Sequence, residues 1–209
     1  SHNYYSDITR ELTYWLCLAL CRTQKEERFY EEVKALDGAD YWFLKGFFQR
    51  IATKYNSAEN FLKKALEISP SMQRAKRELV TALLAQHRYP EALSLAKENY
   101  ERDSDNTYHM HAYFRCLVKK VNINREDIAT LKELLDKMEN SYSDKKEELH
   151  MAMNIEFQAN IKRKSPDEML DLIRNAEKNF PSSVNIQRAA HEYKLKQAIV
   201  SKEVVFPED

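Results

Sequence analysis

Glycine is rare in this chain, and its rarity limits the folds that the chain can adopt. Only two glycines, Gly38 and Gly46, occur among 209 residues, together with five prolines. Turns and sheet hairpins depend on glycine and proline, so a sheet protein of this length would need many more of them. Two isolated glycines also cannot form a glycine-rich phosphate-binding loop. The composition therefore predicts an all-α fold.

Apolar residues recur with the period of an α-helix along almost the whole chain. Short polar breaks divide this pattern into eleven expected helices. Because short connections make consecutive helices pack antiparallel, we expect a series of stacked helix hairpins. The expected helices cover residues 5–22, 24–36, 39–53, 57–68, 72–86, 90–102, 106–120, 125–140, 144–163, 166–179 and 183–200.

Several helix ends carry their own sequence signals. Residues 23–26 (Thr-Gln-Lys-Glu) and 165–168 (Ser-Pro-Asp-Glu) both read as capping boxes, in which a hydroxyl and a glutamate satisfy free backbone amides. Asn56 is expected to cap the following helix in a similar way. Pro70 and Pro181 each follow an apolar periodic run, and proline cannot continue a helix.

One 34-residue segment, starting at Ala39, shows an internal pattern of small and bulky residues. Small residues at three places let two helices approach closely, and a bulky ring fills the gap beside them. A proline then ends the second helix. The residues that form the pattern are Trp42, Gly46, Tyr55, Ala58, Ala65 and Pro70.

This segment resembles a tetratricopeptide repeat, and weaker copies of the pattern continue to near residue 183. The unit over residues 73–106 stays in phase, although Val80 and Asn99 stand where the family has small residues. The later units diverge further, and Phe157 replaces the expected glycine of the last one. The resemblance implies antiparallel helix hairpins stacked into a right-handed superhelix.

The resemblance also implies a division of the chain. Residues 1–38 are expected to form an N-terminal helix pair, a degenerate repeat or cap, whose residues 1–2 read as a tag remnant. Residues 39–182 form four repeats, and residues 183–209 form a closing helix and tail. The second repeat and its divergent neighbours are similar to the C-terminal arm of a larger bacterial signalling or defence protein. This resemblance implies a sensor or scaffold role.

In this family the first helix of each hairpin lines a concave groove. When the groove positions of the family are carried over to this sequence, the resemblance implies a groove rich in Arg and Lys with interleaved aromatic rings. Such a stripe suits an acidic, partly apolar peptide or protein surface. The alternative is that some of these side chains are core and that others pair with Glu on a neighbouring helix. The predicted partner-binding residues are Phe43, Phe47, Arg50, Arg74, Arg77, Tyr108, His111, Arg115, Lys119, Asn154, Gln158 and Lys162.

Net charge bears on the choice between protein and nucleic-acid partners. The chain has 33 basic and 33 acidic residues, so no overall field attracts nucleic acid. RNA or other nucleic-acid binding through the same basic and aromatic face is the alternative function. An intramolecular partner domain or a second copy of the chain would also fit an interaction module. No run of 18 apolar residues is present, so no membrane partner is expected.

The sequence gives little support for disulfide bonds, metal binding or catalysis. Three cysteines, Cys17, Cys21 and Cys116, are too few for a disulfide framework and fit a reducing cytoplasm. His109 and His111 with Cys116 make a poor metal site, because the two histidines are two residues apart and diverge on a helix. No catalytic motif occurs, so we expect no enzyme activity, no cofactor and no metal.

Overall fold

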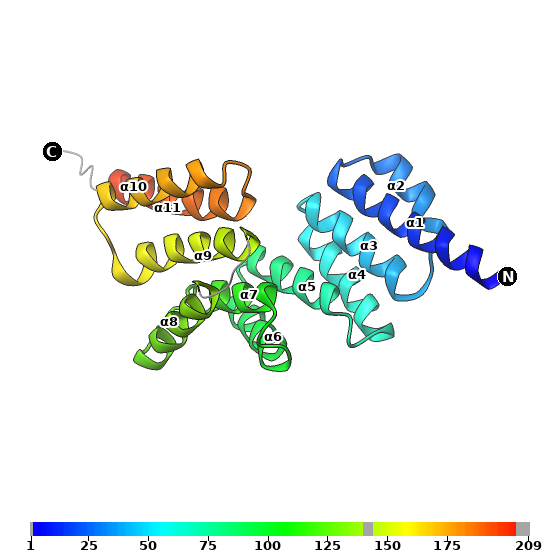
Figure 1. The fold of residues 1–209 in the computed structure, drawn as a ribbon, viewed down its shortest axis with the longest axis horizontal. Coiled ribbons are helices and arrows are strands. Elements are labelled where there is room, and N and C mark those ends of the chain that lie inside the picture. Colours follow the sequence, from blue (N-terminus) through cyan, green and yellow to red (C-terminus); the bar gives the residue numbers. More distant parts are fainter. Residues whose placement is uncertain (1, 140–143, 204–209) are drawn as a thin grey trace. The chain divides into compact units, whose positions relative to one another are not determined.

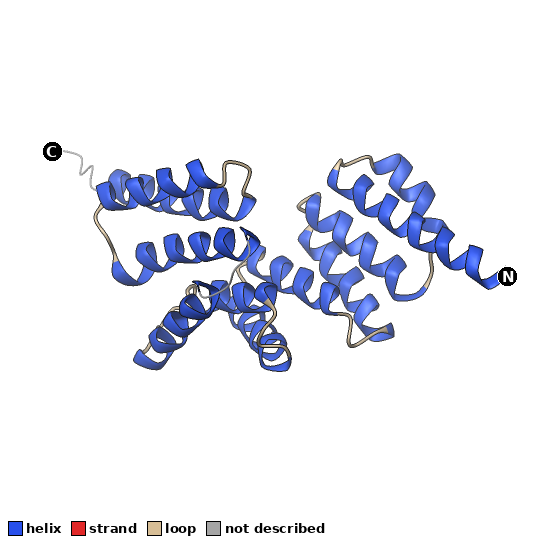
Figure 2. Ribbon diagram, viewed as in Figure 1, coloured by secondary structure: helices blue, strands red, loops and turns tan. Residues whose placement is uncertain are grey.

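The computed structural model describes residues 2–139 and 144–203, and within these ranges its regular secondary structure is all helix, joined by loops and turns (Figure 2). The all-α prediction is confirmed, and the eleven α-helices of the described residues follow the expected segments closely. A short 3-10 helix, η1 (Val33–Ala35), extends the second of them. The α-helices are α1 (His2–Arg22), α2 (Glu26–Glu32), α3 (Gly38–Ile51), α4 (Tyr55–Ile68), α5 (Gln73–Ala85), α6 (Tyr89–Arg102), α7 (Thr107–Leu117), α8 (Arg125–Glu139), α9 (Asp144–Phe157), α10 (Pro166–Asn179) and α11 (Val184–Glu203).

The helices form two compact units, unit 1 (Ser1–Asp103) and unit 2 (Ser104–Asp209) (Figure 1). Unit 1 contains the hairpins α1/α2, α3/α4 and α5/α6, whose first helices pack in the order α1, α3, α5. Unit 2 contains α7/α8 and α9/α10, and its last helix α11 packs against α9. We call the first helix of each hairpin, together with α11, an A helix. The predicted division into a cap, four repeats and a closing helix stays a prediction.

The hairpin α3/α4 shows why small residues are needed between two helices. A methyl group on Gly46 would lie 2.7 Å from Cγ of Leu62, closer than carbon atoms approach. Ala58 and Ala65 on α4 are fully buried. Trp42 stacks on Phe61 with 5.7 Å between ring centroids, filling the space beside the contact. The packing roles predicted for Gly46, Trp42 and the two alanines are confirmed.

All three hairpins of unit 1 turn with a left-handed residue that is not glycine. Gln24, Thr53 and His87 have φ angles of 54°, 59° and 60°. In each turn the next residue donates back over five residues, as the Lys54 N–H does to the Gln49 carbonyl at 2.8 Å. This pattern is the Schellman motif, which satisfies the last free carbonyls of the first helix.

Two of the predicted helix caps are wrong. The segment 23–26 ends α1 instead of capping α2, because the Thr23 hydroxyl donates back to the Ala19 carbonyl at 2.9 Å. Asn56 cannot cap α4, because that helix already begins at Tyr55. In both places the Schellman turn of the preceding helix leads directly into the next one, which leaves no room for a separate cap.

The third predicted cap, at the start of α10, is confirmed. Ser165 accepts from the Glu168 amide at 3.4 Å, and the Glu168 carboxylate accepts from the Ser165 amide at 3.0 Å. Both partners of the capping box are therefore in place. Pro166 occupies the first turn, where its missing N–H costs nothing.

The expected helix over residues 144–163 has two parts. α9 ends at Phe157, and the chain continues as a π-helix, η2 (Gln158–Lys162), before Arg163 turns left-handed with φ 52°. Phe157 stands where the repeat pattern has glycine, and its side chain is buried. The inserted π turn widens the helix where the family pattern is lost.

Candidate functional site

The A helices of unit 1 carry a connected group of aromatic and charged side chains. Tyr14 of α1 stacks on Phe43 of α3 at 6.4 Å between centroids, with 20° between the ring planes. Phe43 stacks in turn on Phe47 at 5.9 Å and 21°. These rings form a column across two hairpins. We define the A face of unit 1 as Asp7, Arg10, Glu11, Tyr14, Trp15, Asp40, Phe43, Phe47, Arg50, Arg74, Arg77 and Glu78.

Guanidinium groups cover the aromatic column. The Arg74 guanidinium carbon lies 4.6 Å from the Tyr14 ring centroid and 5.2 Å from that of Phe43. Arg50 covers Phe47 at 5.0 Å. A planar guanidinium over a ring gains cation–π attraction and excludes water from the ring face. The predicted residues Phe43, Phe47, Arg50 and Arg74 are therefore brought together, although Phe43 is almost wholly buried.

Carboxylates on neighbouring A helices pair with these arginines. Asp40 of α3 pairs with Arg74 of α5, and Arg50 of α3 pairs with Glu78 of α5. The Arg77 Nε lies 3.7 Å from the same Glu78 carboxylate. These pairs match the alternative that the sequence left open, in which predicted groove cations pair with acids on adjacent helices.

The formal charge of the A face follows from its members. Four arginines oppose four carboxylates, so the face sums to zero (4 − 4). The predicted basic stripe is therefore corrected for unit 1. Sequence position alone identified the arginines but not the carboxylate of Glu78, because Glu78 falls outside the positions that the family pattern assigns to the groove.

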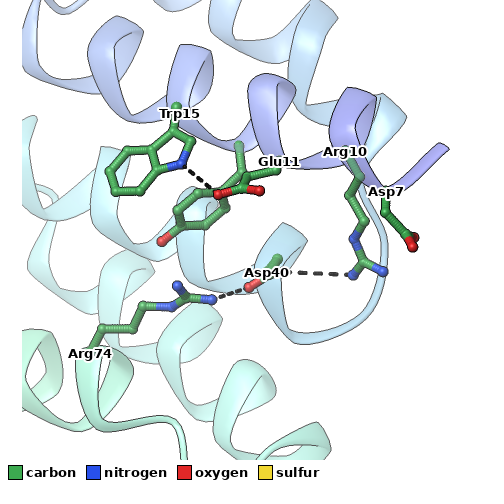
Figure 3. A pocket seen from close by; sticks show the side chains of 7 residues that line it. Asp7, Arg10, Glu11, Trp15, Asp40 and Arg74 are labelled. Carbon is green, nitrogen blue, oxygen red and sulfur yellow. Dashed lines mark hydrogen bonds and ion pairs between the residues drawn. The ribbon is translucent and has the colours of Figure 1, made fainter. Parts of the chain in front are cut away.

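A pocket of about 300 Å³ opens on the A face between α1, α3 and α5 (Figure 3). Trp15 forms part of its wall and is 58% exposed, and its indole N–H donates to Glu11 at 3.5 Å. Arg10 lies 3.1 Å from Asp37 and 3.6 Å from Asp40. The lining residues are Asp7, Arg10, Glu11, Tyr14, Trp15, Asp40 and Arg74.

Sequence reasoning missed the contribution of α1 to this site. The segment before Ala39 has no repeat motif, so no family positions could be carried onto it. Tyr14 and Trp15 nevertheless form a perpendicular pair at 5.8 Å beside the pocket. The available signal was a tryptophan on the helix face opposite the buried Cys17 and Cys21.

The A helices of unit 2 share a buried ionic group. The Glu156 carboxylate of α9 lies 3.0 Å from the Arg188 guanidinium of α11 and 3.9 Å from Arg115 Nε of α7. Burial, followed by the nearby Arg188, lowers the pKa of Arg115 to about 10. Lys119 pairs with Glu192 at 2.7 Å. Burial acts to raise the pKa of Glu192, but this hydrogen bond and the charges of Lys119, Arg188 and Arg115 together lower it. These two predicted cations therefore hold helices together.

The other predicted residues of unit 2 are not drawn into one site. Tyr108 is 42% exposed, whereas His111 is buried. Gln158 donates to Asn154 at 3.0 Å, which joins α9 to η2. Lys162 is exposed at the end of η2. In unit 2 the predicted positions thus serve mainly as core, helix contacts and surface groups.

The cysteines are buried and unpaired in disulfides. Burial raises the pKa of Cys21 and Cys116 to about 12 and that of Cys17 to about 11. Such thiols stay protonated at neutral pH and make poor nucleophiles. In the described part of the chain, no three His, Cys, Asp or Glu side chains are grouped to hold a metal ion.

Residues 2–139 and 144–203 include no helix that is both long and apolar enough to cross a membrane.

The succession of helix hairpins gives the chain the fold of a helical-repeat protein, and the comparisons with known proteins agree. Residues 50–120 match the profile of the family described as Tetratricopeptide repeat. The matched segment overlaps the 34-residue unit that begins at Ala39, so the resemblance to this family that the sequence predicted is confirmed over residues 50–120.

Two solved structures are similar to this chain at low sequence identity. One is YrrB, described as a TPR protein with an unusual peptide-binding site, which is 16% identical with a TM-score of 0.52. That alignment covers 85% of this chain and 89% of YrrB. MamA AMB-1 is 12% identical, with 82% and 98% coverage and a TM-score of 0.49. No curated protein sequence matches the chain.

Proposed function

We propose that this protein binds a peptide or a protein surface on the A face of unit 1. The tetratricopeptide fold supports a protein-interaction module in general. The observation that carries the proposal is Trp15, a large exposed ring beside a pocket that is already formed. Tryptophan and arginine are the side chains most enriched among residues that dominate binding energy.

The A face is also held in place before any partner arrives. Arg74 is fixed by Asp40 on one side and by two aromatic rings on another. Arg50 is fixed in the same way by Glu78 and Phe47. Side chains that are already ordered lose little entropy on binding, which favours affinity. The arrangement therefore suits the capture of a flexible polypeptide.

The net charge of zero on the A face determines which class of partner we expect. An acidic partner, as predicted from the sequence, would compete with Asp40 and Glu78 for their arginines. We therefore propose a partner with an apolar or aromatic anchor and charged groups of either sign. Nucleic-acid binding needs an excess of cations to release counterions, and this face has none.

The solved structure of YrrB, whose title names a peptide-binding site, is consistent with a peptide partner. A sensor or scaffold role within a larger protein, in the cytoplasm, follows from the family resemblance and belongs to this proposal. The proposed activity is binding alone, without catalysis or cofactor.

The test starts from a random peptide library displayed on phage and selected on the full chain. We expect an enriched sequence motif, and we expect the synthetic peptide to bind with little dependence on salt. Arg74→Ala should weaken binding at least about fivefold, because an arginine that stacks and forms ion pairs contributes on the order of 1 kcal/mol or more.

Arg102→Ala on α6 is the matched control, because Arg102 is an exposed arginine that pairs with a glutamate, Glu98, at 2.9 Å. Both variants must keep the circular dichroism spectrum of the wild type. Equal binding by both variants would place the site elsewhere. Recovery of nucleic acid alone, with a steep fall of affinity as salt rises, would replace the proposal with nucleic-acid binding.

A further inference from the structure

We infer that the pocket between α1, α3 and α5 accepts a cationic side chain, and a guanidinium in preference, from the polypeptide that the A face binds. This inference rests on the proposed function and adds the chemical class of the group that the pocket holds.

The pocket and its rim carry more negative than positive charge. Its two arginines, Arg10 and Arg74, already have acidic partners in Asp37 and Asp40. Asp7 also lines the pocket, and it has no ion pair among the described residues. Its charge is therefore not neutralised by either arginine.

Glu11 is the second carboxylate of the pocket without a cationic partner in the described chain. Among the described residues, its carboxylate accepts one long hydrogen bond of 3.5 Å, from the Trp15 indole N–H to Oε1. Together with Asp7 and Asp40, three carboxylates line the pocket against two arginines, which leaves an excess of one negative charge (3 − 2). An incoming cation would meet this excess.

Trp15 supplies the ring against which a cation would lie. Tryptophan is the aromatic side chain that attracts cations most strongly. The two neighbouring rings, Tyr14 and Phe43, each already carry the Arg74 guanidinium at 4.6 and 5.2 Å. Trp15 is 58% exposed, and no cation of the described residues lies over its ring. Two of the three rings, Tyr14 and Phe43, therefore already carry a guanidinium, and the ring of Trp15 carries none from the described residues.

The spacing of these groups along α1 brings them within reach of one side chain. Asp7, Glu11 and Trp15 follow one another at intervals of four residues, so they line a single helix face. Figure 3 shows Glu11 directed toward the Trp15 indole, with Asp7 further along the same helix. A planar guanidinium can stack on a ring and donate in its own plane to carboxylates, which an ammonium group cannot do as well.

An acidic side chain is the competing occupant, and the ion pairs disfavour it. It would have to displace Asp40 from Arg74 while lying close to Glu11 and Asp7. A neutral polar side chain would gain neither the charge attraction nor the cation–π contact. The pocket therefore distinguishes among three classes of side chain by their charge.

The test uses the full chain labelled with ¹⁵N, whose two tryptophans give separate indole N–H signals. The probes are N-acetyl-arginine amide, its neutral isostere N-acetyl-citrulline amide, and N-acetyl-glutamate amide, each titrated at low salt. We expect the arginine probe alone to shift the Trp15 signal along a saturating curve. The Trp42 signal, from a half-buried ring stacked on Phe61, serves as the internal reference and should stay in place.

Two variants with conservative changes complete the test. Asp7→Asn with Glu11→Gln should weaken the arginine probe about fivefold, as expected when exposed ion pairs are lost. Glu27→Gln with Glu31→Gln on α2 is the control, because these exposed carboxylates have the same spacing of four. All four positions are exposed, so no loss of folding is expected in either variant.

The result that overturns the inference is an equal shift by the citrulline and arginine probes, a shift by the glutamate probe alone, or no saturable shift at all. The proposed function fails separately. If selected peptides bind regardless of their cationic residues, the A face is a binding surface but the pocket is not selective. If the arginine probe binds and no selected peptide does, the pocket is selective and the proposed function fails.

Discussion

The guanidinium carbon of Arg74 lies 4.6 Å from the ring centroid of Tyr14, although the two residues belong to the first and third hairpins of unit 1. Asp40, on the hairpin between them, pairs with the same guanidinium. One arginine therefore joins three successive A helices. A surface made in this way depends on the stacking of the hairpins, so its stability and its binding properties are linked.

The close approach of Gly46 on α3 to Leu62 on α4 gives a first prediction. Gly46→Ala should lower the free energy of unfolding by about 1–3 kcal/mol, because the new methyl group meets Leu62 within a packed core. The higher helix propensity of alanine offsets up to about 1 kcal/mol of this cost. Urea unfolding followed by circular dichroism measures the change, and a more stable variant would contradict the packing described for α3/α4.

The turn between α3 and α4 predicts a change of the opposite sign. Thr53 is a β-branched residue held at φ 59°, a conformation that costs an L-residue about 1 kcal/mol. Thr53→Gly should therefore raise the free energy of unfolding by up to about 1 kcal/mol, less the extra entropy of glycine in the unfolded chain. Thermal unfolding should show a higher midpoint for the variant, and a lower one would count against a strained turn.

Sequence reasoning predicted the fold well where the signal was local. The Ser165 capping box and the roles of Gly46 and Trp42 depend on residues within one hairpin, and all are confirmed. The turns at Thr53 and His87 were not predicted, because a left-handed residue is expected to be glycine or asparagine.

The candidate site was harder to predict, because it depends on contacts between hairpins. The arginines were identified, but their pairing with Asp40 and Glu78 follows from the stacking of α3 against α5. Phe43 was expected at a binding surface, yet Arg74 and Tyr14 cover it. A partner that comes from another hairpin cannot be recognised from spacing within one.

The buried ionic group of unit 2 gives a third prediction. Glu156→Gln should lower the free energy of unfolding by about 2–3 kcal/mol, because it leaves two partly buried arginines without their shared, buried carboxylate. Replacing Glu156, Arg115 and Arg188 together by Leu, Met and Leu should restore most of that stability. Urea unfolding of both proteins checks the prediction, and a neutral effect of the single change would show that Glu156 does not stabilise the group.

Glu59 predicts how the stability of unit 1 depends on pH. Burial acts to raise its pKa, but hydrogen bonds from Lys63, Gln86 and Arg88 outweigh burial and lower it. Since the folded pKa lies below the unfolded value, Glu59 contributes fully above about pH 4.3. That contribution is lost as the pH falls through the folded pKa.

Unfolding free energies of the wild type and Glu59→Gln, measured from neutral pH into acid, test this sign. The wild type should be more stable at neutral pH, and the difference should shrink below about pH 4 as the carboxylate is protonated. A difference that stays constant across the whole range would mean that the charge of Glu59 does not contribute.

The most direct test of the account is the affinity of one selected peptide for two variants of the full chain. Trp15→Ala removes the exposed ring of the A face, and Ile68→Ala removes an apolar side chain of similar exposure on α4, at 54%. Fluorescence polarisation with the labelled peptide gives both dissociation constants. We predict at least about tenfold weaker binding for Trp15→Ala and an affinity within about twofold of the wild type for Ile68→Ala. Equal affinities of the two variants would contradict the assignment of the A face as the binding surface.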